Sequence, residues 1–430
     1  MASNNPHSSQ HALPSVLGRY FDLELVSGSG CYLTDRHGNQ YLDFSSGIGV
    51  TSTGHCHPKV VQAIQSQAET LIHPCIAIGT SAPPLELSQK IETICRDAFG
   101  PSQTYQSFFA QSGSEAVEAA IKLAKYVSKR SNIVAFSGGF HGRTYGALSL
   151  TTSKEKYREG YAPFLPNIDF FPYPYMYRRP WPGTSDEACL EAGIQALTHS
   201  PLLNEEVAAV IIEPILGEGG YVPAPAPFLI ALAKRCRQLG ILLIADEIQS
   251  GMGRAGTWFA SSHAPIQPDM ITLAKGLASG MPLSACVAKK SLMDQWPPGA
   301  HGGTYGANPV TCNAANATID VLSGCLESVQ ALGKFAIEML NTQLSTSPYV
   351  GDIRGHGLMI GIELVKDKGS KTPYPELAQQ LMRACLEQGL VVISCGLFDN
   401  VIRLIPPLII DQSTLEKGLS ILVEAIHDSH

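Results

Sequence analysis

The chain has 430 residues, 44% of them hydrophobic and 16% charged, and this composition excludes an intrinsically disordered protein. Its length predicts about two or three domains, or one large α/β unit with a subsidiary domain. Thirty basic against 37 acidic residues give a net charge of −7, and no basic run stands out, which argues against a nucleic-acid-binding surface.

The predicted elements begin with a loose arm at 1–19 and a β-hairpin at 31–44, followed by helices at 57–70 and 84–99. Short apolar runs without polar alternation then alternate with helical stretches. Such runs are typical of strands that are buried on both faces. We therefore expect an α/β protein with a mostly parallel sheet and helices on both sides, with strands at 107–109, 133–136, 207–212, 241–245, 270–274 and 284–288.

The later part of the chain changes character. Asn167–Ser185 is rich in Pro and Tyr and is predicted to be a long loop. After a helix at 314–325, the tail predicts an α+β domain with helices at 328–344, 375–388 and 413–427 and strands at 358–364, 391–394 and 401–405. We therefore divide the chain into an N-terminal arm and part of a small domain (1–57), a large domain (58–325) and a C-terminal small domain (326–430).

Short segments of the sequence bear on the cellular location of the protein and on whether it binds a metal. Apolar stretches such as Val207–Ile212 are too short to cross a bilayer. A secretory signal or a transit peptide needs basic residues near the N-terminus, but no Lys or Arg precedes Arg19, so neither is expected. Eleven scattered Cys without a CxxC pair are typical of reduced thiols, so we expect a cytoplasmic protein with no membrane partner. His55-Cys56-His57 is a poor chelating set because adjacent ligands cannot easily close on one ion, so no metal is expected.

The first motif with chemical potential opens the helix that follows residue 110. Ser112 and Glu115 have the spacing of a capping box. Gly113, between Ser112 and Ser114, also leaves amide N–H groups and hydroxyls exposed at a helix N-terminus, which suits a dianion such as phosphate. A plain helix cap is the alternative interpretation.

Two predicted strands end in reactive groups. The run Ile241–Ala245 leads directly into Asp246, and functional groups gather at the carboxyl ends of strands in open parallel sheets. The run Met270–Ala274 ends in Lys275, whose amine form is easier to reach when the side chain is desolvated at the mouth of a sheet. Such a lysine can bind a carbonyl carbon covalently. An acidic loop and a surface lysine are the alternatives.

The segment Gly251–Gly256 matches the GxGxxG pattern of dinucleotide-binding sites. However, Asp246–Ser250 separates it from its strand, and no good helix begins at its last glycine. No acidic residue closes a second strand about 20 residues further on. We therefore expect no dinucleotide site at this position.

The three remaining units match the needs of pyridoxal 5'-phosphate. This cofactor requires a lysine for its aldehyde, a carboxylate beside its pyridine nitrogen and a cradle for its phosphate. Lys275, Asp246 and the Ser112–Ser114 segment supply these groups. The carboxylate keeps the ring nitrogen protonated, so that the ring can accept electrons.

At these residues the sequence resembles the class III aminotransferases, of pyridoxal phosphate transferase fold type I. The resemblance runs from about Val26 to the C-terminus and rests on GHCHP, SGSEAVEAAIKLA, FHGRT, IIEPILGEGG, LLIADEIQSGMGR, TLAKGLASGMPL, GGTYGANP and DIRGHGLMIGIEL. Within this class, the tail Ile393–Leu404 resembles 4-aminobutyrate aminotransferases most. The resemblance implies a large cofactor-binding domain and a smaller α+β domain from both chain ends.

The resemblance also assigns roles at the cofactor. Lys275 would bind its aldehyde and shuttle a proton, Asp246 would pair with the pyridine nitrogen, and Glu213 would lie near these catalytic residues. Thr304 would reach the phosphate of the neighbouring subunit, which implies an obligate homodimer, with a tetramer left open. The other cofactor contacts implied are Ser112, Gly113 and Ser114 at the phosphate, Phe140 and Ile248 on the two ring faces, His141 beside Phe140, and Gln249 at the phenolic oxygen.

For substrates, the resemblance implies amino transfer from an ω-amino acid to 2-oxoglutarate. Arg143 would bind the distal carboxylate and Arg403 the α-carboxylate of glutamate, since arginine suits bidentate carboxylate binding. Glu218 would neutralise Arg403 when 4-aminobutyrate, which has no α-carboxylate, is bound. Ile48 would line the substrate side. Acetylornithine or ornithine-type aminotransferases and amino-acid racemases of the same group remain alternatives.

Overall fold

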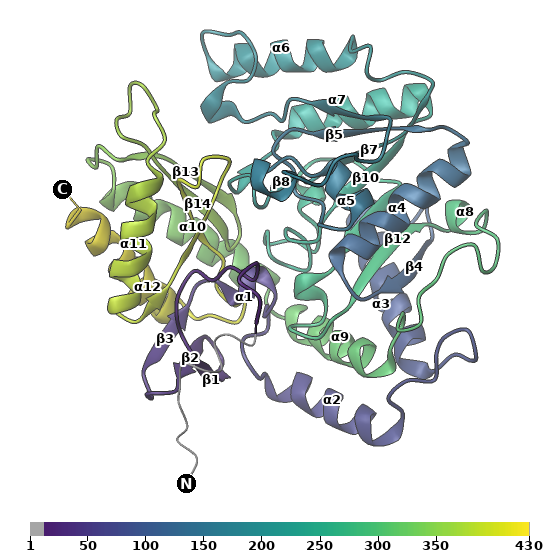
Figure 1. Cartoon of the computed structure of the whole chain (residues 1–430), viewed down its shortest axis with the longest axis horizontal. Coiled ribbons are helices and arrows are strands. Elements are labelled where there is room, and N and C mark those ends of the chain that lie inside the picture. Colours follow the sequence, from purple (N-terminus) through teal and green to yellow (C-terminus); the bar gives the residue numbers. More distant parts are fainter. Residues whose placement is uncertain (1–12, 430) are drawn as a thin grey trace.

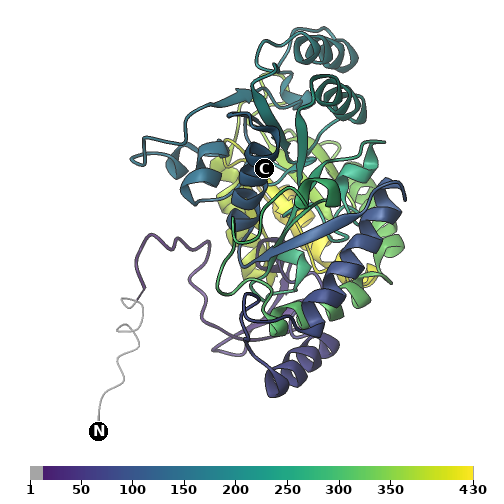
Figure 2. The ribbon, with the colours of Figure 1, turned by 90° about the vertical axis from the view of Figure 1, so that its right-hand side faces the viewer.

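The computed structural model describes residues 13–429. The first 12 residues of the predicted arm and His430, at the end of the predicted C-terminal domain, lie outside the described residues. Figure 1 shows two groups of elements: the middle of the chain forms one, and both chain ends contribute to the other. In Figure 2, helices α6 (Asp186–Thr198) and α7 (Ala226–Leu239) lie at one end of the molecule and α2 (Pro58–Thr70) at the other.

The middle of the chain forms a seven-stranded sheet in the order β4-β12-β11-β10-β7-β5-β6. Its strands are β4 (Tyr105–Ala110), β5 (Asn132–Phe136), β6 (Ile168–Phe171), β7 (Val207–Ile212), β10 (Leu242–Asp246), β11 (Met270–Leu273) and β12 (Ser284–Lys289). Strand β12 is antiparallel to both of its neighbours, whereas the pairs from β11 to β6 are parallel. The prediction of a mostly parallel sheet is confirmed.

Helices cover both faces of this sheet because its strands are apolar on both sides. All six residues of β7 are buried. Alternate residues join different cores: Val210 packs with α7, and Ile211 packs with α4 (Gly113–Ser128). The remaining helical elements of this region are α3 (Ala82–Phe99), α5 (Tyr145–Leu150), α8 (Lys290–Met293), α9 (Pro309–Leu322), η3 (Glu155–Tyr157), η4 (Met176–Arg178), η5 (Ala260–His263) and η6 (Lys275–Leu277).

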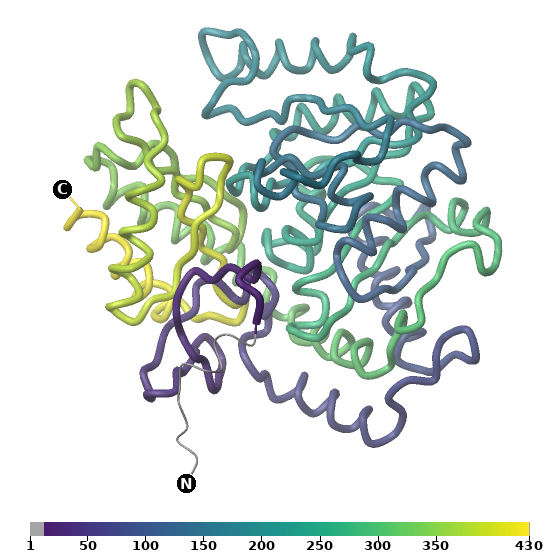
Figure 3. The backbone as a smooth tube through the Cα atoms, viewed as in Figure 1, coloured from purple at the N-terminus to yellow at the C-terminus, as the bar shows by residue number. Residues whose placement is uncertain are grey.

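The two chain ends are joined by hydrogen bonds. Strands β1 (Leu25–Ser29), β2 (Tyr32–Asp35) and β3 (Gln40–Asp43) form a sheet that β15 (Leu390–Val391) extends in parallel. Figure 3 shows these purple and yellow segments side by side. The other elements here are α1 (Ser46–Gly49), α10 (Leu326–Gln343), α11 (Pro375–Glu387) and α12 (Gln412–His427), with a sheet of β13 (Val350–His356), β14 (Met359–Leu364), β17 (Val401–Leu404) and β16 (Ile393–Cys395).

Several elements differ from the sequence prediction. The predicted loop at 167–185 was wrong in part, because Ile168–Phe171 forms the edge strand β6 against β5 and Met176–Arg178 forms the short helix η4. The four residues of β6 are too few to show the alternation of apolar and polar residues that predicts a strand. Strand β13, whose residues are mostly polar or glycine, was not expected. The domain boundaries after residues 57 and 325 stay a prediction. Within residues 13–429, no helix is long and apolar enough to span a membrane.

Candidate active site

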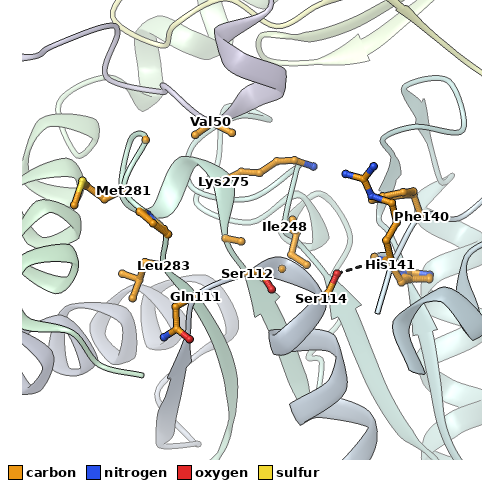
Figure 4. A pocket seen from close by; sticks show the side chains of 16 residues that line it. Val50, Gln111, Ser112, Ser114, Phe140, His141, Ile248, Lys275, Met281 and Leu283 are labelled. Carbon is orange, nitrogen blue, oxygen red and sulfur yellow. Dashed lines mark hydrogen bonds between the residues drawn. The ribbon is translucent and has the colours of Figure 1, made fainter. Parts of the chain in front are cut away.

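A cavity of about 310 Å³ lies at the carboxyl ends of the central strands. Its walls come from segments far apart in the chain: Val50, 111–114, 140–143, Ile248, Ala274, Lys275 and 280–283. In Figure 4 the Lys275 side chain extends across the cavity with its amine toward Phe140. The cavity therefore brings together Ser112–Ser114 and Lys275, and Asp246, which does not line it, is hydrogen-bonded to the lining residues His141 and Ile248.

Lys275 follows β11 directly, at the beginning of the short helix η6. Its backbone has φ of +42°, a left-handed conformation that is uncommon for a residue with a side chain. Such strain often marks functional sites. Burial lowers the pKa of the Lys275 amine, and the nearby carboxylates of Glu218, Glu213 and Asp246 oppose this shift only in part. The neutral amine is therefore more accessible than in an exposed lysine.

Asp246, the last residue of β10, is buried and held by three hydrogen bonds. One carboxylate oxygen lies 2.7 Å from Nδ1 of His141. The other accepts from the hydroxyl of Thr272 at 2.8 Å and from the N–H of Ile248 at 3.2 Å. Burial alone would lower the pKa of His141, but the hydrogen bond and charge of Asp246 outweigh it, and the pKa is raised.

The beginning of α4 forms the wall next to the segment that carries His141, where Ser114 Oγ accepts from the N–H of Arg143. The predicted capping box is present: Ser112 Oγ accepts from the N–H of Glu115, whose carboxylate accepts from the N–H of Ser112 at 2.7 Å. These bonds do not involve the amides of Gly113 and Ser114, which stand in the first helical turn. A Cβ on Gly113 would lie 2.9 Å from Ile248 Cδ1, so a larger residue there would push the Ile248 side chain aside.

Glu213, which follows β7, connects two backbone segments beside the cavity. Its carboxylate accepts from the N–H of Phe140 at 2.7 Å and from the N–H of Gly217 at 2.8 Å. Burial raises the pKa of Glu213 to about 7, with the charge of His141 opposing the shift and that of Asp246 adding to it. Glu213 thus holds the segment that carries Phe140 and His141 against the loop that carries Glu218.

Arg403 and Glu218 form a buried ion pair at 2.5 Å between Nη1 and Oε1. Burial raises the pKa of Glu218, but the charge of Arg403 and its hydrogen bond outweigh burial and lower the pKa below its usual value. Nη2 of Arg403 donates to the hydroxyl of Tyr20 at 3.1 Å. The predicted pairing of Glu218 with Arg403 is present, and Tyr20 of the N-terminal arm is added to it.

Three other residues predicted for the site, Arg143, Gln249 and Ile48, differ in their exposure and in whether they line the cavity. Arg143 is exposed and lines the cavity, and its N–H donates to Ser114 Oγ at 3.1 Å. The hydroxyl of Tyr221 donates to Oε1 of buried Gln249 at 2.8 Å. Ile48 is half-buried with φ of +67°. It does not line the cavity, whereas Val50, two residues later in the chain, does.

Thr304 is exposed and does not line the cavity of its own chain. The phosphate contact predicted for it would be made in a neighbouring subunit, so its role stays a prediction.

Sequence reasoning did not find four residues near the site: Tyr20, Tyr157, Tyr221 and Thr272. Only Thr272 had a usable signal, because it is the polar residue in the apolar run before Lys275; the structure places it opposite Asp246 in the parallel pair of β10 and β11. Tyr20 reaches Arg403 across 383 residues of sequence, which no local pattern reveals. The ring of Tyr157 packs edge-on against Phe140 with centroids 5.5 Å apart.

A family profile described as Aminotransferase class-III matches residues 18–426. The chain belongs to this family. A probable 4-aminobutyrate aminotransferase from Bacillus subtilis is 39% identical over 92% of this aminotransferase and 91% of the relative. An alanine/serine racemase from Pyrococcus horikoshii is 37% identical over 96% of this chain and 87% of its own.

Among solved structures, an amine transaminase from an uncultivated Pseudomonas species, crystallised in a PLP-bound form, superposes with a TM-score of 0.89. It is 27% identical and covers 100% of this chain and 98% of its own. The predicted fold class and the resemblance to class III aminotransferases are thereby confirmed.

Proposed function

We propose that this aminotransferase moves the amino group of an ω-amino acid, such as 4-aminobutyrate, to 2-oxoglutarate with pyridoxal 5'-phosphate as cofactor. The buried Arg403–Glu218 pair beside Lys275 carries the proposal. An arginine that alternates between an internal carboxylate and a substrate carboxylate suits an enzyme whose two substrates differ by one carboxylate. The similarity to the Bacillus subtilis relative supports the same substrate class.

The residues that line and surround the cavity suit the chemistry of this cofactor. When bound, pyridoxal phosphate supplies an aldehyde for the amino group and a ring that accepts electrons from the reacting carbon. Asp246 would hold the proton on the ring nitrogen. His141, which lines the cavity and whose Nε2 is buried without a partner among the described residues, is hydrogen-bonded to Asp246 through Nδ1. The remaining proposed contacts are Ser112, Gly113 and Ser114 with the phosphate, Phe140 and Ile248 with the ring faces, and Gln249 with the phenolic oxygen.

Lys275 would act as both covalent anchor and proton carrier. The amine can take up a proton only when it is neutral, and burial lowers its pKa in that direction. Nζ of Lys275 would hold the cofactor through its aldehyde and, when free, would accept the proton that leaves the substrate carbon and release it again. Glu213 keeps Phe140 in place during this exchange through the bond to its N–H.

Charge balance at Arg403 explains how one site can serve two substrates. Glutamate brings an α-carboxylate that can replace Glu218 on Arg403. Nε of Arg403 is buried and has no partner among residues 13–429, so a donor is available for that carboxylate. 4-Aminobutyrate lacks this group, and Arg403 would then keep Glu218, because an unpaired buried charge is costly. Arg143, exposed at the cavity wall, would bind the distal carboxylate of both substrates.

Substitution of each member of the pair tests this proposal. Arg403→Ala should lower kcat/KM in the glutamate half-reaction by about 10²-fold or more, with a smaller loss for 4-aminobutyrate. Glu218→Gln should harm the 4-aminobutyrate half-reaction more, because Arg403 loses its neutralising partner. Single-turnover absorbance changes measure each half-reaction. Equal losses in both halves for both variants would refute the exchange at Arg403.

The similarity to an alanine/serine racemase defines a second candidate, isomerisation of an α-amino acid. A racemase does not need 2-oxoglutarate, whereas the proposed reaction does. A panel of amine donors with and without 2-oxoglutarate, with the stereochemistry of the remaining donor measured, separates the two. Racemisation without an acceptor, together with no turnover of 4-aminobutyrate, would favour the racemase.

We also propose an obligate homodimer, with Thr304 of each copy completing the phosphate site of the other. Its exposed position, outside the cavity of its own chain, supports this arrangement. Mixing a Thr304→Arg variant with a Lys275→Ala variant tests it by complementation. A mixed dimer would combine both lesions in one site and leave the other intact, so activity should appear on mixing.

A further inference from the structure

Glu218 stands in a glycine-rich turn that needs external support. The turn, Gly217–Tyr221, joins the two-residue strands β8 (Ile215–Leu216) and β9 (Val222–Pro223) and is called here the Glu218 loop. Gly220 has φ of +124°, a conformation that is readily available only to glycine. Because two paired residues on each side hold such a turn weakly, the position of the Glu218 carboxylate depends on contacts from outside the hairpin.

One of these contacts comes from Arg354 on β13. Its Nη2 donates to the carbonyl oxygen of Gly220 at 2.7 Å. The same guanidinium donates through Nη1 to the carboxylates of Asp352 at 2.7 Å and Glu363 at 2.8 Å, and through Nη2 to the hydroxyl of Tyr175 at 2.7 Å. A guanidinium with this many partners is held in one orientation, so it can fix the backbone it touches.

The register of the sheet places this contact in line with Arg403. Arg354 on β13 and Arg403 on β17 both stand opposite Gly361 on β14, the strand between them. Directly opposed residues project from the same face of a sheet. A Cβ on Gly361 would lie 3.2 Å from the Gly220 carbonyl oxygen and 3.1 Å from Tyr221 Cβ. The Glu218 loop thus rests on Gly361, with its backbone bound by Arg354 and its carboxylate bound by Arg403.

We propose that Arg354 is a positioning residue that holds the Glu218 loop so that Glu218 reaches Arg403, and that it thereby sets the balance between the two half-reactions. The substrate consequence rests on the proposed function. With the loop backbone fixed, exchange of carboxylates at Arg403 requires only the Glu218 side chain to move. A loosened loop would weaken the Glu218–Arg403 pair, which matters for the substrate without an α-carboxylate.

Arg354→Lys tests this with a matched control, Arg178→Lys. Lysine keeps the charge beside Glu363 and Asp352 but has a single terminal nitrogen, so it cannot reproduce the separate contacts of Nη1 to the carboxylates and of Nη2 to Gly220. Arg178 also binds Glu363, with Nε to Oε1 at 2.9 Å, and within residues 13–429 it has no hydrogen bond to the Glu218 loop. Arg354→Lys should lower kcat/KM for 4-aminobutyrate by about tenfold and for glutamate by less than about threefold, whereas Arg178→Lys should leave their ratio unchanged.

Hydrogen exchange in residues 217–221 provides a readout that does not depend on the substrate. Exchange there should be faster in Arg354→Lys than in Arg178→Lys or the unmodified enzyme. If hydrogen exchange in residues 217–221 is unchanged in Arg354→Lys, the inference is overturned, even if the enzyme acts on 4-aminobutyrate. If hydrogen exchange there is faster in Arg354→Lys but the unmodified enzyme does not turn over 4-aminobutyrate, only the proposed function is refuted. Equal losses in both half-reactions, or the same ratio in both variants, also overturn the inference.

Gly361→Ala tests the same support without changing any charge. Its methyl group would press on the Gly220 carbonyl and displace the Glu218 loop by a few tenths of an ångström. The 4-aminobutyrate half-reaction should again suffer more than the glutamate half-reaction. An unchanged ratio in this variant as well as in Arg354→Lys would show that the position of the loop does not control the pair.

Discussion

The base of the cavity, around Asp246 and Lys275, is built by one sheet, whereas the Arg403 side is assembled from three separate regions. Asp246 and Thr272 stand opposite each other on adjacent strands of the seven-stranded sheet. Arg403 lies on a different sheet, its partner Glu218 is 185 residues away, and Tyr20 belongs to the N-terminal arm. Hydrogen bonds between neighbouring strands thus hold the base, and side-chain contacts between distant segments hold the other side.

This difference matches the two tasks proposed for the site. The groups at the base would keep the same partners in both half-reactions and benefit from a rigid, buried sheet. Arg403 would change its partner in each cycle, which is easier where loops and an arm meet. Substitutions at the base should therefore harm both half-reactions alike, and substitutions on the Arg403 side should separate them.

The largest loss is expected at Lys275. Lys275→Ala should lower turnover by about 10³-fold or more in both half-reactions, because covalent anchoring and proton transfer are lost together. Steady-state assays with both substrates measure the loss, and Lys334→Ala on the exposed face of α10 serves as the control. Turnover within about tenfold of the unmodified enzyme would show that another group carries these steps.

Asp246→Asn should reduce both half-reactions by roughly 10²-fold, because an amide cannot hold the proton on the ring nitrogen. It should also lower the pKa of His141, since Asp246 supplies the hydrogen bond and charge that raise it against burial. NMR titration of His141 measures the second effect. Asp269→Asn, which affects the ion pair with Lys289 instead, is the control. An unchanged His141 pKa would contradict the assigned coupling.

Tyr20→Phe should have a smaller and selective effect. Removing the hydroxyl takes one hydrogen bond from Arg403 and leaves Glu218 in place. The two half-reactions should change by about three- to tenfold and unequally, as single-turnover rates would show. Tyr32→Phe, on strand β2, is the matched control. Equal changes in both halves would place Tyr20 outside the exchange at Arg403.

The smallest expected effect concerns stability and pH. The pKa of Glu213 is about 7 in the folded protein, against about 4.3 in an unfolded chain. Between these values the folded protein keeps a proton that the unfolded chain has lost, so the contribution of Glu213 to stability declines as pH rises. Glutamine does not titrate. The difference in free energy of unfolding, Glu213→Gln minus the unmodified protein, should therefore rise by about 1 kcal/mol or more from pH 5 to pH 8. Urea denaturation at each pH measures this difference. A constant or falling difference would contradict the raised pKa.

Much of the base of the site could be predicted because its determinants are local. The apolar runs before Asp246 and Lys275 indicate buried strands, and strand ends in a parallel sheet meet at one edge. Ser112 and Glu115 mark the beginning of α4 through their spacing alone. The chain itself thus determines which residues end strands, begin helices and face the cavity base.

Tertiary structure alone decided the rest. The resemblance suggested that Glu218 pairs with Arg403, but the contacts of Tyr20 and Arg354 depend on how the C-terminal sheet packs against the large one. No short-range period or cap encodes that packing, because it results from the summed shapes of side chains throughout the cores of both regions. The alignment of Arg354, Gly361 and Arg403 likewise depends on the register of three strands, which becomes defined only when those strands pair.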